Sequence, residues 1–126
     1  MKKTYPAIFH KDENNGYWIE FPEFGGGTEG EDLEDAMKNA REMLEGILAS
    51  YLDEGMALPI ASDIQKISVN DGFVTMIQAD PTPFLKNNKA IRKNVTVPEW
   101  LVRFADREQV NYSEVLTQAL EKKLQL

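Results

Sequence analysis

Acidic side chains crowd one short stretch of the sequence and raise the question of metal-dependent chemistry. Five carboxylates fall close together there: Glu29, Glu31, Asp32, Glu34 and Asp35. Nucleases of the two-metal type need several carboxylates that converge on the same ions. These carboxylates instead stand at the expected start of a helix, where acidic residues cap the helix and complement its dipole. We therefore expect no metal site and no catalytic residue. The alternative to this expectation is a metal-dependent ribonuclease that uses acidic residues of the first part of the chain.

A glycine-rich stretch overlaps these carboxylates. Residues 25–30 read Gly-Gly-Gly-Thr-Glu-Gly, which formally matches the G-x-G-x-x-G pattern of dinucleotide-binding loops. Such loops bind a pyrophosphate through backbone amides at a helix start. Here Glu29, Glu31 and Asp32 would repel that group, and no parallel βαβ order surrounds the motif. We interpret the stretch as a flexible turn and expect no cofactor.

His10 is the single histidine of the chain. No serine or cysteine motif accompanies it in the sequence, so there is no evident nucleophile for it to activate. A general-base role stays open, but a place beside Lys11 at the end of an expected strand is typical of a surface residue.

A second set of residues has the chemistry of base and phosphate recognition. Residues 92–97 read Arg-Lys-Asn-Val-Thr-Val, and in a strand alternate side chains point to opposite faces. Val95 and Val97 then share one face, and Arg92, Asn94 and Thr96 share the other. Arginine can pair with guanine, asparagine with adenine, and threonine with a phosphate or a thymine methyl group. The predicted DNA-binding residues are Arg92, Lys93, Asn94, Thr96 and Ser113.

The net charge of −7 and the pI near 4.7 argue against a protein that coats nucleic acid indiscriminately. This total hides a split. Up to Leu85 the chain has six basic and sixteen acidic residues, a net of −10. The remaining forty-one residues have eight basic and five acidic residues, a net of +3. The acidic part would attract a basic partner, and the basic part suits nucleic acid.

The first part of the chain has the pattern of an α+β sheet with one long helix packed on it. An Asn-Gly pair predicts a hairpin between the first two strands, and Asp32 and Gly55 mark the start and the end of the helix. The expected strands, the last two joined by Asn-Asp-Gly, cover residues 5–11, 17–21, 64–69 and 73–79, and a third strand before the helix stays open. Alternation places Trp18 and Glu20 on the sheet face opposite Ile19, and whether a helix covers Trp18 stays open.

Two prolines in Asp80-Pro81-Thr82-Pro83 end the sheet pattern and mark a boundary. Beyond it the sequence predicts a strand over residues 92–97, a helix over 99–108, and a second helix with Ser113 as its N-cap. One strand and two amphipathic helices cannot enclose a core. Two copies could pair their strands into a ribbon that fits the major groove of DNA. The alternative is a basic linker with a helical hairpin docked on the first module.

Two stretches resemble known families. Residues 90–124, with Ala-Ile-Arg-Lys-Asn-Val-Thr-Val-Pro-Glu-Trp-Leu and Val-Asn-Tyr-Ser-Glu-Val-Leu-Thr-Gln-Ala-Leu, resemble the ribbon-helix-helix repressors. Residues 5–59, with Tyr-Pro-Ala-Ile-Phe, Gly-Tyr-Trp-Ile-Glu-Phe-Pro-Glu-Phe and Asp-Glu-Gly-Met-Ala-Leu-Pro, resemble the HicB antitoxins. The order of the two stretches is that of a HicB antitoxin with a ribbon-helix-helix tail. One departure concerns Gln109, which stands where ribbon-helix-helix proteins commonly have glycine and suggests a different cap geometry.

The resemblance implies a partial RNase H-like fold in domain 1–80, a linker over 81–89, and a DNA-binding and dimerising domain over 90–126. It also implies a partner, the small basic ribonuclease HicA, and repression of the shared operon. We expect a non-enzymatic, cytoplasmic antitoxin without a membrane partner, a homodimer that could pair again into a tetramer. Its toxin-binding residues are not identifiable from sequence. A ribbon-helix-helix repressor that senses a small ligand is a third reading.

Overall fold

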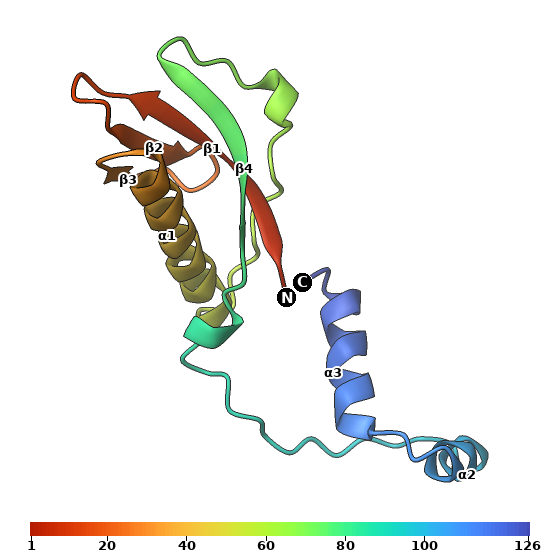
Figure 1. Cartoon of the computed structure of the whole chain (residues 1–126). Coiled ribbons are helices and arrows are strands. Elements are labelled where there is room, and N and C mark those ends of the chain that lie inside the picture. Colours follow the sequence, from red (N-terminus) through yellow and green to blue (C-terminus); the bar gives the residue numbers. More distant parts are fainter. The chain divides into compact units, whose positions relative to one another are not determined.

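The computed structural model describes all 126 residues, which divide into the units Met1–Asn88 and Lys89–Leu126. In order, the first unit contains β1 (Lys3–Lys11), β2 (Tyr17–Phe21), β3 (Gly26–Gly30), α1 (Leu33–Asp53) and β4 (Gly72–Ala79) (Figure 1). Short 3₁₀ helices cover Ile64–Lys66 and Thr82–Phe84. The second unit contains α2 (Glu99–Arg107) and α3 (Tyr112–Lys123). No helix of the chain has both the length and the apolar character needed to cross a membrane.

The four strands of the first unit form one sheet in the order β3-β2-β1-β4, and every neighbouring pair is antiparallel. β1 lies inside the sheet and pairs with β2 through Phe9 and Ile19 and with β4 through Phe9 and Phe73. Helix α1 packs against one face of this sheet (Figure 1). The predicted α+β architecture, an antiparallel sheet with one long helix, is confirmed.

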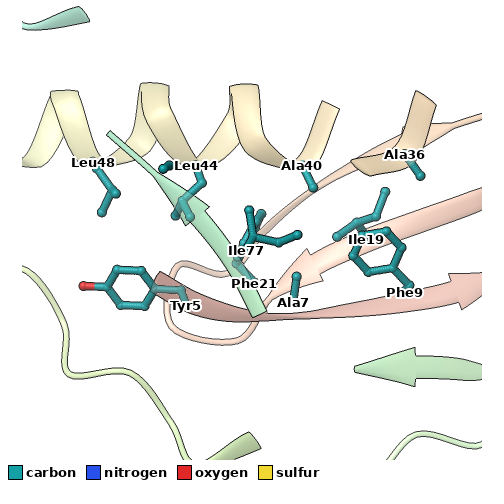
Figure 2. Packing of buried hydrophobic residues seen from close by; sticks show 11 residues of the cluster. Tyr5, Ala7, Phe9, Ile19, Phe21, Ala36, Ala40, Leu44, Leu48 and Ile77 are labelled. Atoms are coloured by element: carbon teal, nitrogen blue, oxygen red, sulfur yellow. The ribbon is translucent and has the colours of Figure 1, made fainter. Parts of the chain in front are cut away.

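The core lies between α1 and the sheet. Ala36, Ala40, Leu44 and Leu48 recur every four residues on α1 and are fully buried. The sheet contributes Tyr5, Ala7, Phe9, Ile19, Phe21, Ile77 and Ala79, and Figure 2 shows these two sets facing each other. Since the side chains of β1 and β2 alternate, only every second residue of each strand reaches this core.

Both ends of α1 have the caps that the sequence predicts. At the start, the Asp32 side chain accepts a hydrogen bond from the amide of Asp35 at 2.8 Å, and the Asp35 carboxylate accepts one from the amide of Glu31 at 2.9 Å. At the end, Gly55 has a φ of +69°, and its amide donates to Leu52 at 3.1 Å. This left-handed conformation suits glycine and ends the helix.

The predicted hairpin between β1 and β2 is also confirmed. Asn15 adopts a φ of +65°, as an Asn-Gly turn allows. The side chain of Asp12 accepts hydrogen bonds from the amides of Asn14 and Gly16 at 2.9 and 2.8 Å. These bonds satisfy backbone groups inside the loop and set the register of the two strands.

The glycine-rich stretch was wrongly interpreted as a flexible turn, because Gly26–Gly30 is strand β3. It pairs along β2 from Tyr17 opposite Gly30 to Phe21 opposite Gly26. A Cβ atom on Gly27 would lie 2.7 Å from the carbonyl oxygen of Ile19. Glycine at this position therefore allows the close approach of two backbones, and flexibility is not its role.

The expected strand over residues 64–69 is also wrong. Ile64–Lys66 forms a 3₁₀ helix, and Asp63 caps it by accepting from the amide of Gln65 at 3.0 Å. Ile64 and Ile67 stand three residues apart, a spacing that fits a 3₁₀ turn better than the two-residue period of a strand. The Asn-Asp-Gly turn leads into β4, which pairs with β1 instead.

Leu44 offers a direct test of this core. Leu44→Ala is expected to lower the free energy of unfolding by about 2 to 5 kcal/mol, because it removes buried methyl groups and leaves a cavity. Met37→Ala, at a side chain that is 36% exposed, should cost about 1 kcal/mol or less. Urea unfolding followed by Trp18 fluorescence in a Trp100→Phe background reports on the first unit alone. Equal losses for the two variants would contradict this packing.

Candidate functional site

No residue of the second unit is buried. From Lys89 to Leu126 every side chain is exposed except three of intermediate exposure, Val102, Ala105 and Val110. Large apolar side chains are 36 to 64% exposed on both helices and at the C-cap of α3: Leu101, Phe104, Val115, Leu116, Leu120 and Leu124. A unit of this kind has too little buried apolar surface to stay folded without a cover.

The segment before α2 is the predicted strand of the ribbon. Residues 92–97 form no strand in the single chain, because a strand needs a hydrogen-bonded neighbour and the chain provides none here. Val95 and Val97 nevertheless line an apolar depression, whose other walls include Leu101 of α2 and Leu116 of α3. Both valines therefore stand on the helix side of the segment.

The candidate DNA-binding residues lie on the same exposed segment. Arg92, Lys93 and Asn94 line a second depression with Ser113 and with Thr117 of α3. Lys93 also borders the apolar depression, and Thr96 borders neither. The structure thus brings Ser113 beside Arg92, Lys93 and Asn94, while Thr96 stands apart from this group on an exposed stretch of backbone.

The sequence predicts Ser113 as the N-cap of α3, and this prediction is wrong. The cap is Asn111, whose side chain accepts from the amide of Glu114 at 3.1 Å, and Ser113 is the second residue of the helix. Asparagine caps a helix as well as serine does, so the two candidates differ only in position. Ser113 keeps its place in the first turn, where backbone amides and the helix dipole favour an anion.

The turn between α2 and α3 has the geometry usually made with glycine. Gln109 has a φ of +55°, its amide donates to Asp106 at 3.1 Å, and the amide of Val110 donates to Ala105 at 3.0 Å. This is the Schellman pattern, so the expectation of a different cap geometry is wrong. Tyr112 strengthens the turn, because its hydroxyl donates a hydrogen bond to the carboxylate of Asp106.

The acidic residues near the start of α1 serve that helix. Asp32 and Asp35 are occupied as caps, and Asp12, Glu29 and Glu31 border a shallow depression of about 520 Å³ beside them. The structure gathers no group of three acidic or histidine side chains at a spacing that could hold a metal ion. The arrangement makes this end of the sheet strongly negative.

His10 is not a plain surface residue, which corrects the expectation from its place in the sequence. Its Nδ1 lies 2.7 Å from Asp71 Oδ1 and its Nε2 lies 2.9 Å from Glu20 Oε1, and the side chain is only 14% exposed. Its ring stacks on Trp18 with 4.0 Å between centroids and 12° between planes. The contact of His10 with Asp71 could not be predicted from their spacing in the sequence, because Asp71 reaches His10 only through the pairing of β4 with β1.

The two carboxylates control the protonation of this histidine. Burial of the ring lowers the pKa of His10, but the hydrogen bonds and charges of Glu20 and Asp71 outweigh it. The pKa therefore lies above its ordinary value of 6.5. A protonated ring donates to both carboxylates at once, which a neutral ring cannot do.

Trp18 is the exposed aromatic residue of this sheet face. The predicted alternation is confirmed, because Ile19 and Phe21 are buried against α1 while Trp18 is 45% exposed on the opposite face. Within the first unit the question left open by the sequence is thereby answered, since α1 packs on the other face and does not cover Trp18. Glu29 is its direct partner across β2 and β3.

Comparisons with known proteins cover almost the whole chain. Residues 5–122 match the family described as HicB_like antitoxin of bacterial toxin-antitoxin system. A chain of the toxin-antitoxin complex from Streptococcus pneumoniae is 27% identical with a TM-score of 0.64, over 98% of this chain and 99% of that one. The antitoxin HicB of Burkholderia pseudomallei has a TM-score of 0.56 at 22% identity, over 97% and 96%, and supports the fold alone.

One curated relative is also similar over nearly its full length. It is a 14.9 kDa protein from the rep-hol intergenic region of Haemophilus phage HP1 (strain HP1c1), and it is 29% identical over 131 residues. The match covers 95% of this chain and 96% of the phage protein.

The His10 group predicts a titration that proton NMR can follow without ambiguity, since the chain has one histidine. The midpoint of the His10 ring resonances is expected above 6.5, and Glu20→Gln should lower it by removing one acceptor and its charge. Glu42→Gln, an exposed change on α1, is the control and should leave the midpoint in place. A wild-type midpoint at or below 6.5 would contradict the hydrogen bonds described here.

The same pKa fixes the sign of a pH effect on stability. A raised folded-state pKa stabilises the fold fully below 6.5, and this contribution is lost as pH rises through the folded-state value.

Proposed function

Because the chain belongs to the HicB-like antitoxins of bacterial toxin-antitoxin systems, we propose that it neutralises a HicA-like, mRNA-cleaving toxin by direct binding and represses its own operon through operator DNA. In this proposal the protein is not an enzyme and needs no cofactor. The first unit binds the toxin and the second unit binds DNA.

The observation that carries the repressor part is the lack of any buried residue in the second unit. A second copy can supply the cover. Antiparallel pairing of the two 92–97 segments gives each one the strand neighbour that it lacks and brings four helices together. Val95, Val97 and Leu101, which are 40 to 60% exposed in the single chain, then become the core of a homodimer.

Such a ribbon presents its polar face to DNA. Once the two 92–97 segments pair as strands with Val95 and Val97 on the helix side, alternation would turn Arg92, Asn94 and Thr96 to the opposite side. A two-stranded ribbon of this width fits the major groove, where arginine and asparagine read base edges. Lys93 and the first turn of α3 at Ser113 contribute contacts to phosphates. The second unit would thus bind DNA while the first unit binds the toxin.

The acidic charge of the first unit supports the toxin-binding part. The net charge of −10 up to Leu85 attracts a basic ribonuclease. The acidic unit then competes with RNA for the basic surface of that ribonuclease. This unit has its own core between α1 and the sheet, so it can present a rigid surface to a partner. The similarity to a chain of a streptococcal toxin-antitoxin complex supports a toxin as that partner. β3 and β4 are the edge strands of the sheet, and pairing through one of these edges would join two dimers into a tetramer.

Two substitutions test the DNA-binding part. Arg92→Ala and Asn94→Ala should each weaken binding to the DNA upstream of the protein's own gene about 5- to 150-fold, because one lost base contact costs about 1 to 3 kcal/mol. Electrophoretic mobility shift measures this. Arg103→Ala removes the same charge from α2, where Arg103 pairs with Glu99 at 2.9 Å, and should bind nearly as the wild type does. Unretarded DNA with the wild type would reject repression.

Co-expression tests the toxin-binding part. The protein is expected to restore growth of cells that express the small basic protein encoded by the adjacent reading frame. Arg92→Ala should restore growth equally well, because it changes only the DNA-binding face. Unabated toxicity in the presence of well-expressed wild-type protein would reject neutralisation.

A further inference from the structure

The uncovered sheet face has an aromatic and acidic notch at the β2–β3 edge. Trp18 and Glu29 are direct cross-strand partners, so their side chains stand on the same face. With Gly27 and Thr28 they line a shallow depression of about 410 Å³. Gly27 adds no side chain, which leaves the space beside the indole open.

Trp18 is held in place before any partner arrives. The His10 ring stacks on one face of the indole, and the bonds of His10 to Glu20 and Asp71 fix that ring from both sides. A tryptophan that is 45% exposed yet immobilised loses little conformational freedom on binding. Tryptophans of this kind are common among the residues that dominate binding energy in protein interfaces.

The charge around the notch selects a cation. Glu29 is exposed beside the indole, and it also borders the acidic depression that contains Asp12, Glu31 and Asp35. His10, when protonated, offsets only one of the two carboxylates that it contacts. A lysine or arginine side chain here gains both the indole face and the Glu29 carboxylate. A second copy of this acidic surface would be repelled instead.

We propose that Trp18 and Glu29 form the anchor site for a lysine or arginine side chain of the basic toxin. The proposal rests on the proposed function and adds the residues through which the first unit holds its partner. The bound cation lies over the exposed indole and pairs with Glu29, while the rest of the uncovered face contacts the surrounding toxin surface.

Calorimetric titration of the full-length antitoxin with the purified product of the adjacent reading frame tests this site. Trp18→Ala is expected to weaken binding about thirtyfold or more, the loss typical of an aromatic anchor. Trp18→Phe, which keeps a ring, should lose much less. Glu29→Lys should weaken binding far more than Glu42→Lys, a matched charge reversal at an exposed position of α1.

A second measurement does not depend on affinity. In a Trp100→Phe background, 5-fluorotryptophan labels Trp18 alone, because the chain has two tryptophans. Its fluorine resonance is expected to shift when the toxin is added. Thermal melting checks the fold of each variant, and Glu29→Lys keeps the test valid if Trp18→Ala unfolds, since the Glu29 side chain is exposed.

The outcomes separate the two proposals. If the wild type binds the toxin and the Trp18 and Glu29 variants bind equally well, the anchor site is rejected and the proposed function stands. If the wild type does not bind, both are rejected. If Trp18→Ala changes the mass of the free antitoxin in sedimentation, a second copy occupies the notch and the anchor site is likewise overturned.

Discussion

The one-sided burial of β1 and β2 against α1 determines the rest of the first unit. Because strand side chains alternate, the burial of Phe9 and Ile19 under the helix places His10 and Trp18 on the other face. The same alternation that builds the core thus builds the His10 and Trp18 stack. Any change of register by one residue would lose both at once. The core and the exposed functional surface are two consequences of one pairing.

The second unit meets the need for burial in a different way. Its apolar side chains are arranged for packing, yet none of them is buried in the single chain. In the proposed homodimer, folding of this unit and its association would be one process, whose extent depends on protein concentration. The polar face of residues 92–97 would gain a fixed geometry only in that process. Base recognition would therefore be available to the dimer and absent from the monomer.

Sequence patterns predicted those features whose signals are local. The Asn-Gly turn at Asn15 and the cap at Gly55 depend on the backbone preferences of single residues, and both were found where expected. The errors arose where tertiary contacts decide. Gly27 belongs to a strand because it must approach Ile19 closely, and His10 is enclosed because β4 pairs with β1. Gln109 accepts a strained conformation because the Schellman bonds of the turn hold it there.

The connection between the units gives the proposed functions a physical link. The Asp53 carboxylate accepts hydrogen bonds from the amides of Lys86 and Asn87 at 2.9 to 3.2 Å, which fastens the start of the connecting segment to the end of α1. In the proposed homodimer, the second unit would tether two first units, each with its proposed toxin site. Two toxin sites and two DNA half-sites would then sit in one assembly. Tethering would raise the effective concentration of the second DNA-binding ribbon strand at the operator, so DNA that engages both copies would favour the dimer.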